Sequence, residues 1–504
     1  MLDNLIAAFW LVAEPSTLLS IVAASLFGFV VGALPGLTAT MAVALMVPIT
    51  FLLSPIAAIA SIVSAAAMCI AAGDIPGALL RMPGTPASAA YVEEAYALSR
   101  KGDAGFVLGT SAFFSMVGGV IGTVVLIMAS PVLANFALRF SGFEFFWLGC
   151  LGLSCAVFVA SDDVLKGMAS LMIGLLIATV GMDFGTGYPR FTMGTYVLME
   201  GVSFIPALIG MFALPEILRS LSAPAEIHRV AQTSAREAWG KVFGAAKRYW
   251  LVALRGSGLG TLLGALPGAG ADIASWISFA LAKRFSKEPE KWGKGHIEGI
   301  IAGSTSNNAA LAGAWIPALV FAIPGDTITA IAIGVLYLKG LNPGPTVFIN
   351  NADLIYAVFL VFLIANLLLL PFGMLSMKIA SLVLRVPRNL IMPALLVLAA
   401  TGAFAIDNDA SGILIMLAMG ILAYGMESAG LPLAPAVLGI VLGKIVEQNL
   451  IQSLISSQGD LLAFFGRPLS AVLGVVTIVV WTVPLIRMLR KTFAPRTHDE
   501  ETQA

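Results

Sequence analysis

The chain has 504 residues, of which 59% are hydrophobic and 11% charged, and its 28 basic and 28 acidic residues give a formal net charge of zero. A soluble domain usually carries about a quarter charged residues, so this chain cannot cover itself with a solvated surface. The neutral balance gives no indication of nucleic-acid binding, and the three cysteines, all inside apolar runs, match no disulfide framework and no metal-site spacing.

Apolar runs long enough to cross ~30 Å of hydrocarbon recur along almost the whole chain. Clear examples are residues 107–127, 355–370 with their flanks, and 469–485. We expect about 10–12 such segments, several of them interrupted by Gly or Pro. A β-barrel would instead show short alternating segments. The sequence therefore predicts an all-α polytopic protein in a lipid bilayer, with its first apolar segment retained because no basic n-region or cleavage site accompanies it.

The first helix break is expected at Gly32–Gly36, within residues 1–80, which contain no Lys or Arg. Its flanks, roughly residues 26–52, are uncharged. This hairpin is therefore free to open toward the outside of the cell.

A second interrupted segment, residues 257–282, has basic clusters on both sides, around Arg248 and around Lys287. Both flanks are therefore expected on the cytoplasmic side, yet two full crossings need about 40 residues. The centre, residues 264–272, is rich in Gly and contains a Pro, which makes it a poor continuous helix. We interpret it as a re-entrant hairpin. The basic tail after residue 486 likewise predicts a cytoplasmic C-terminus.

The two breaks belong to an apparent internal repeat. Gly-Ala-Leu-Pro-Gly at residues 32–36 recurs at 264–268, an offset of 232, and the Ile-Pro and Pro-Gly pairs at 75–84 recur at 316–325, an offset of 241. One such match alone fits chance as well as duplication, but several in the same order favour duplication. We predict two inverted repeats, residues 1–215 and 250–486, each with a re-entrant or broken-helix hairpin, a basic cytoplasmic linker at 216–249 and a cytoplasmic tail at 487–504. Paired interrupted segments indicate a transporter's binding site.

A broken helix offers free N–H groups to a carboxylate and free carbonyls to Na⁺. Gly36, Gly268 and Gly270 would let the backbone approach a ligand, although close helix packing is the alternative. Thr38 and Asp272 follow the breaks where helix caps belong, so Asp272 is either a ligand or a cap.

Polar residues inside apolar runs add further candidates. A central Asp costs about 2.5–3.5 kcal/mol, so Asp74, Asp272 and Asp326 must each face a cavity, an ion or a donor. The consecutive amides Asn307 and Asn308 fit either a helix–helix contact or a site. Arg81 either clamps a substrate carboxylate or pairs with Asp74. No hydrolase motif is present, so we expect no enzymatic activity.

The chain closely resembles the large membrane subunit of the tripartite tricarboxylate transporters, the TctA family. The similarity spans nearly the whole length. The segments that carry it are residues 32–48, 83–90, 264–272 with 282–287, 307–309, 323–325, 340–345 and 432–435. The resemblance implies a carrier of the bacterial inner membrane driven by an ion gradient. It also implies two partners, a small membrane subunit of about four helices and a periplasmic solute-binding protein.

Some positions depart from the family pattern. Ala72-Gly73-Asp74 stands where Gly-Gly-Ser is usual, Arg81-Met82 where an Asn is common, and Asp326 where a Ser is usual. An acidic residue often precedes the Asn pair, but here the chain reads Gly-Ser-Thr-Ser. These departures weaken the inference to citrate-like tricarboxylates.

The sequence thus predicts the translocating subunit of a binding-protein-dependent, cation-coupled importer for small organic anions such as di- or tricarboxylates. A stand-alone carrier or channel is the alternative. The candidate substrate-binding residues are Gly36, Thr38, Asp74, Arg81, Pro83, Gly84, Thr85, Gly268, Gly270, Pro324 and Gly325. The candidate ion-binding residues are Thr38, Asp272, Asn307, Asn308 and Asp326. No cofactor is expected, with Na⁺ or H⁺ as the coupling ion.

Overall fold

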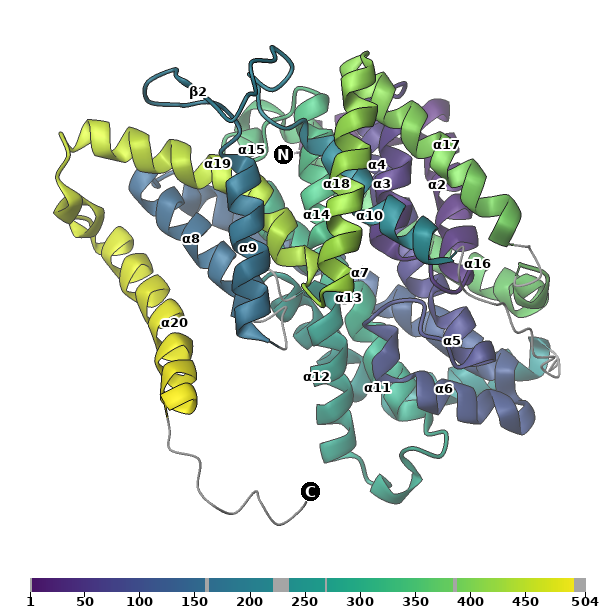
Figure 1. Cartoon of the computed structure of the whole chain (residues 1–504). Helices are drawn as coiled ribbons and strands as arrows, with labels where there is room; N and C mark the ends of the chain where they lie inside the picture. Colours follow the sequence, from purple (N-terminus) through teal and green to yellow (C-terminus); the bar gives the residue numbers. More distant parts are fainter. Residues whose placement is uncertain (1, 159–162, 221–234, 268–269, 384–387, 494–504) are drawn as a thin grey trace, which may run out of the picture.

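The computed structural model describes residues 2–158, 163–220, 235–267, 270–383 and 388–493. Most of them are helical, which confirms the predicted all-α membrane fold (Figure 1). In the first half the helices are α1 (Leu2–Ala13), α2 (Pro15–Ala33), α3 (Ala39–Thr50), α4 (Pro55–Ala72), α5 (Asp74–Leu80), η1 (Ser88–Ala90), α6 (Val92–Leu98), η2 (Ser99–Asp103), α7 (Ala104–Ala137), α8 (Gly142–Phe158), α9 (Val164–Ala178) and α10 (Phe204–Ser220).

The second half continues with α11 (Ala235–Gly264), α12 (Gly270–Phe285), η3 (Pro289–Lys291), α13 (Ile297–Phe321), α14 (Thr327–Leu338), α15 (Val347–Asn350), α16 (Ala352–Val383), α17 (Arg388–Asp407), α18 (Ala410–Ser428), α19 (Leu433–Ser456), η4 (Leu461–Phe465) and α20 (Pro468–Phe493). Two short antiparallel strands, β1 (Gly181–Met182) and β2 (Pro189–Arg190), lie between α9 and α10. Helices α10 and α11 run across residues 215 and 250, so the predicted linker boundaries fall inside helices rather than between them.

Within the described residues, six helical segments are long and apolar enough to cross a membrane, among them Pro55–Leu80, Val92–Ala137 and Ala352–Met377. Further apolar helices of 10–17 residues accompany them. Helices α7, α13 and α16 pack together with α2 and α4, whereas α20 lies at one edge against α8 (Figure 1). Many large apolar side chains are exposed on the surface of the protein, as expected for a surface that contacts lipid.

Both predicted helix breaks are present. α2 ends at Ala33 and α3 begins at Ala39, where the Thr38 hydroxyl accepts a hydrogen bond from the Met41 N–H (3.2 Å). The chain turns at Gly36, whose φ of +89° is a conformation that favours glycine. α11 ends at Gly264 and α12 begins at Gly270, also at positive φ (+56°).

Close glycine contacts hold each hairpin against the long helix beside it. An added Cβ would lie 2.3–2.4 Å from a backbone oxygen of the facing helix at four positions: Gly28 on Ala65, Gly32 on Cys69, Gly260 on Ser306 and Gly264 on Ala310. Each glycine of the first hairpin lies 232 positions before its counterpart in the second hairpin, the same offset as between the two Gly-Ala-Leu-Pro-Gly motifs. The residues that these glycines face are 241 positions apart, the same offset as between the Ile-Pro and Pro-Gly pairs. Small residues of this kind allow membrane helices to approach closely.

The ends of α5 and α13 also match. Each helix ends on a left-handed residue 241 positions from the other, Arg81 (φ 60°) and Ala322 (φ 56°). The residue after each of these donates its backbone N–H to a proline carbonyl: Met82 to Pro76 (3.3 Å) and Ile323 to Pro317 (3.3 Å). The two prolines are also 241 positions apart. This agreement in backbone conformation supports the predicted duplication, and the inverted orientation stays a prediction.

The two flanks of the second hairpin lie together. Arg248 on α11 forms an ion pair with Glu288, which follows α12 (3.4 Å), and the Arg255 guanidinium lies over the Phe285 ring (5.6 Å to its centroid). α11 bends at Tyr249 (φ −113°, ψ 23°), so the arm from there to Gly264 and the whole of α12 each rise only ~24 Å, at 1.5 Å per residue. That is shorter than the ~30 Å of hydrocarbon.

The connection from α12 to α13 is ordered by Glu94, which is 2% exposed. Its carboxylate accepts the backbone N–H groups of Gly293, Gly295 (2.8 Å) and His296 (2.6 Å). Nearby, hydrogen bonds from Lys291 and His296 lower the pKa of Glu288 to about 2. This connection and the β1–β2 loop lie at opposite ends of the molecule (Figure 1).

We therefore expect Arg248→Cys and Lys287→Cys, each in a chain whose own cysteines are replaced, to react with an impermeant maleimide from the cytoplasmic side only. Leu462→Cys is the matched control, because Leu462 is 78% exposed in the turn before α20 and the basic tail places that turn outside. Labelling of either hairpin cysteine from the outside would contradict the re-entrant arrangement.

Candidate functional site

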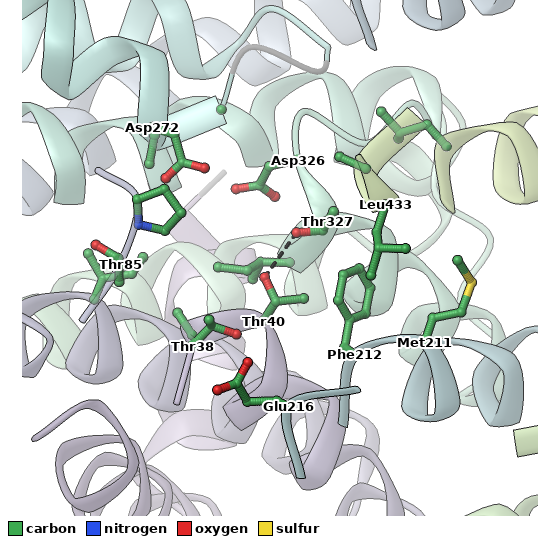
Figure 2. A pocket seen from close by; sticks show the side chains of 18 of the residues that line it. Thr38, Thr40, Thr85, Met211, Phe212, Glu216, Asp272, Asp326, Thr327 and Leu433 are labelled. Atoms are coloured by element: carbon green, nitrogen blue, oxygen red, sulfur yellow. Dashed lines mark hydrogen bonds between the residues drawn. The ribbon is translucent and has the colours of Figure 1, made fainter. Parts of the chain in front are cut away.

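The two broken hairpins meet at a cavity of about 390 Å³. Its walls are the start of α3, the segment after α5, the starts of α12 and α14, one side chain of α13, and parts of α10, α18 and α19 (Figure 2). The polar side chains that line it are Thr38, Thr40, Thr85, Glu216, Asp272, Asn307, Asp326, Thr327 and Glu427. Both halves of the chain therefore contribute to one site.

A hydroxyl pair joins the two halves inside the cavity. The Thr40 and Thr327 side-chain oxygens are 2.9 Å apart, and this bond links the first turns of α3 and α14 (Figure 2). Among the described residues, four helices begin at the cavity: α3, α12, α14 and α19. Each brings the positive end of its dipole to the site.

Asp326 and Asp272 have different local roles. Asp326 is the N-cap of α14, because its carboxylate accepts the Thr329 N–H (2.8 Å) and the Thr329 hydroxyl bonds back to it. Asp272 lies in the first turn of α12 rather than at its cap. Its carboxylate accepts the Ala87 N–H and faces Asp326 closely enough for the two charges to interact (Figure 2). The cap interpretation of Asp272 is therefore wrong in this fold.

The cavity is strongly acidic. Four carboxylates line it, those of Glu216, Asp272, Asp326 and Glu427, and the lining residues among those described include no Lys, Arg or His. Arg219 lies at the edge and forms ion pairs with Glu216 (3.6 Å) and Glu427. A bare polyanion would therefore be repelled here unless cations or protons accompany it.

Six of the residues singled out in the sequence line the cavity: Thr38, Thr85, Gly270, Asp272, Asn307 and Asp326. Gly36 lies next to it, since an added Cβ would be 3.2 Å from a Glu216 carboxylate oxygen. Gly268 is outside the described residues. The remaining candidates, Asp74, Arg81, Pro83, Gly84, Asn308, Pro324 and Gly325, do not line the cavity.

The glycines of the two Pro-Gly pairs pack against other backbone. A Cβ at Gly84 would lie 2.3 Å from the Gly73 oxygen, and one at Gly325 would lie 2.7 Å from both the Ala314 Cα and the Gly264 oxygen. These contacts keep the loops after α5 and α13 close to their helices. The next residues, Thr85 and Asp326, then reach the cavity.

Arg81 pairs neither with Asp74 nor with any group in the cavity. Its guanidinium forms a two-point ion pair with Glu93 (2.9 Å from Nε and from Nη2), and both side chains are about 60% exposed. Asn308 is a helix–helix contact, as the alternative interpretation held, and its amide donates to the Ala67 carbonyl (3.1 Å) on α4. This bond joins two residues that are 241 positions apart.

Sequence reasoning missed four polar lining residues, Thr40, Glu216, Thr327 and Glu427. Thr40 and Thr327 are within two residues of the predicted site residues Thr38 and Asp326. Both follow an expected helix start, so extending each predicted site by one or two residues would have included them. Glu216 and Glu427 lie near the ends of α10 and α18, and nothing local distinguishes them from interfacial residues.

Comparisons with known proteins agree with the motifs. A family model described as "Tripartite tricarboxylate transporter TctA family" matches residues 18–438. An "Uncharacterized 52.8 kDa protein in TAR-I ttuC' 3'region" of Agrobacterium vitis is 33% identical over 498 residues, which are 97% of this chain and 98% of that protein. An "Uncharacterized protein in TAR-II ttuC' 3'region" of the same organism is 34% identical over 234 residues, 46% of this chain and 97% of its own length. No solved structure matches.

Proposed function

The chain belongs to the tripartite tricarboxylate transporter TctA family, and we propose that it is the substrate-translocating subunit of a binding-protein-dependent, cation-coupled importer of small organic anions such as di- and tricarboxylates. Its partners in this proposal are a small four-helix membrane subunit and a periplasmic solute-binding protein. It is a multi-pass membrane protein, and we place it in the bacterial inner membrane with a cytoplasmic C-terminus.

The observation that carries this proposal is the acidic cavity between the two hairpins. Helix starts and backbone N–H groups suit a carboxylate, whereas the side chains of Glu216, Asp272, Asp326 and Glu427 suit cations. A site with both properties favours an anion that arrives together with positive charge. Membership of a transporter family supports translocation rather than catalysis.

Energetics lead to the same mechanism. Moving each negative charge inward against 100 mV costs about 2.3 kcal/mol. A dicarboxylate therefore needs at least two co-transported cations for neutral transport. Na⁺ prefers hard oxygen ligands, and the Thr38, Asp272 and Asn307 side chains offer hydroxyl, carboxylate and amide oxygens in one cavity. A proton is the other candidate coupling ion, since the same carboxylates accept one.

The repeat gives the proposed route for the substrate. The matched packing of Gly28 and Gly260, and of Gly32 and Gly264, supports two related units around one cavity. We propose that the units are inverted and that rocking of one against the other exposes the cavity alternately to each side, as in other carriers built from repeats.

Dependence on partners is the direct test of the tripartite assignment. Proteoliposomes that contain this chain alone should take up negligible radiolabelled carboxylate. Uptake should appear when the small membrane subunit and the loaded binding protein are both present, because the substrate reaches the cavity only from that protein. The substrate for the assay is first chosen by thermal-shift screening of the purified binding protein against mono-, di- and tricarboxylates.

The control is the small membrane subunit with free substrate but without binding protein, which should give no uptake. Robust, saturable transport by the purified single chain would contradict the tripartite assignment. It would favour a stand-alone carrier.

A further inference from the structure

Asp74 lies outside the cavity but remains a buried acidic residue. Its side chain is 4% exposed, in α5 directly after the long apolar helix α4. The Tyr91 hydroxyl donates to its Oδ1 (2.7 Å), and the Ser111 hydroxyl donates to its Oδ2. No ion pair to Asp74 is formed by any described residue. A carboxylate inside a membrane protein without a cationic partner is expensive and usually functional.

The surroundings of Asp74 contain a second, smaller cavity of about 20 Å³. It is lined by Asp74 and Ser111 together with apolar side chains of α2, α4, α7 and α16 and by Ser376. This volume is enough for one water molecule. A water beside a carboxyl group that lacks a counter-ion provides a donor from which the group can take up a proton.

Other ionisable groups on the neighbouring elements are engaged elsewhere. On α2 and α16 the facing residues are apolar, apart from Ser376. Glu93 on α6 pairs with Arg81, Glu94 on α6 holds the connection before α13, and Asp103 before α7 pairs with Lys241 (2.6 Å). Cys69 on α4 is a buried thiol. Tyr91 is therefore the titratable group in direct contact with Asp74 among the described residues.

Tyr91 connects Asp74 to the transport cavity. It is 1% exposed, and its ring packs against Gly303 on α13, one helical turn before Asn307, whose side-chain amide acts electrostatically on the Tyr91 hydroxyl. Asn307 in turn lines the acidic cavity. Hydrogen bonds therefore join Ser111, Asp74 and Tyr91, and the Tyr91 side chain adjoins a residue that we propose as a cation ligand.

We propose that Asp74 is a proton-binding site that controls the cation affinity of the transport cavity through Tyr91 and Asn307. This inference rests on the proposed function, because it concerns a cation in that cavity.

The direction of the effect follows from the donors and acceptors. With Asp74 ionised, the Tyr91 O–H points to Asp74, so the Tyr91 oxygen can only accept from Asn307. The NH₂ group of that amide then faces Tyr91, which leaves the amide oxygen for a cation. A proton taken up on Oδ1 turns that oxygen into a donor to Tyr91. The Tyr91 O–H must then turn to the Asn307 oxygen, and the NH₂ group takes the oxygen's place at the cavity. Proton binding at Asp74 therefore weakens cation binding. By thermodynamic linkage, cation binding weakens proton binding at Asp74 by the same factor.

Equilibrium binding of radioactive Na⁺ to the full-length chain in lipid nanodiscs tests this at a series of pH values. In the wild type we expect the Kd for Na⁺ to rise about tenfold from mildly alkaline to mildly acidic buffer, as is usual for coupled sites. Asp74→Asn keeps the size and the hydrogen bonds but cannot take up a proton, and Tyr91→Phe removes the connection. Both variants should lose most of this pH dependence.

Ser376→Ala is the matched control, because Ser376 lines the small cavity but bonds to the Gly373 carbonyl (2.7 Å) and not to Asp74. It should keep the wild-type pH profile. Infrared difference spectra between acidic and alkaline buffer should show protonated carboxyl bands, and the Asp74→Asn spectrum should lack one component that the wild type and Tyr91→Phe share. Elution as a single peak and an unchanged thermal midpoint show that the variants fold.

The outcomes separate the two proposals. Na⁺ binding with the same pH dependence in all variants, or an infrared difference spectrum that Asp74→Asn leaves unchanged, would overturn the role of Asp74 and leave the proposed function intact. Failure of the wild-type chain to bind Na⁺ at any pH would overturn the cation site itself, and the effect of Asp74 with it.

Discussion

Replacement of Asp272 by Asn is expected to raise the Na⁺ concentration for half-maximal uptake at least tenfold, with a smaller change in the apparent KM for the substrate. Asp272 is in the first turn of α12 and faces the cavity, so the change removes a charge from the proposed cation site but no helix cap. The Ala87 N–H can still donate to the amide oxygen of Asn. Loss of one charged ligand costs about 1.5–3 kcal/mol, which corresponds to a factor of ten or more.

Asp326→Asn is the matched comparison. Asp326 lines the same cavity, but it caps α14, and Asn caps as well as Asp. The fold should therefore tolerate both variants equally, with any difference in thermal midpoint small. Uptake of labelled substrate across a Na⁺ series, in proteoliposomes that contain all three components, gives the measurement. An unchanged Na⁺ dependence in Asp272→Asn, or full uptake driven by a proton gradient without Na⁺, would contradict a Na⁺ site at Asp272.

Replacement of Gly84 or Gly325 by Ala should destabilise the fold strongly, although neither residue lines the cavity. At both positions the new methyl group would lie within 2.3–2.7 Å of backbone atoms, which cannot move aside as a flexible side chain would. Overpacking typically costs 1–3 kcal/mol, and we expect about 3 kcal/mol or more where the obstacle is backbone. The thermal midpoint of the detergent-solubilised protein, followed with a thiol-reactive dye, should fall sharply.

Gly258→Ala provides the control for this experiment. Gly258 is in the interior of α11 and has no neighbouring atom within 4 Å of an added Cβ. Ala is the better helix former by about 1 kcal/mol, so this variant should be as stable as the wild type or slightly more so. Equal thermal midpoints for Gly84→Ala and Gly258→Ala would mean that the loop after α5 is not packed as described. Gly84 would then again be a candidate for ligand binding.

Local sequence determined the class of the protein and the places where its helices break. Low charge and long apolar runs require burial in lipid, and all backbone groups must then be bonded within helices. Pro35 and Pro267 lack an N–H, and Gly36 and Gly270 have positive φ, so the helices are interrupted for reasons that act within a few residues. The motifs of the family resemblance lie in the same segments, so the resemblance and the physical argument indicate the same helix breaks.

The identity of the cavity residues was decided only by the tertiary structure. Asp74 and Asp272 look alike in sequence, each an acidic residue one or two positions after a Gly and next to an apolar run, yet one bonds to Tyr91 and the other faces Asp326. Gly84 and Gly270 are both glycines of conspicuous motifs, but packing removes the first from the cavity.

The physical reason is the distance along the chain between the groups that form the site. Thr40 and Thr327 meet although 287 positions separate them, and their meeting depends on how α3 and α14 are held by the helices around them. A sequence pattern fixes where a helix starts and which residue types stand there. The direction in which each side chain points is set by the glycine contacts between helices, and those contacts exist only in the folded protein.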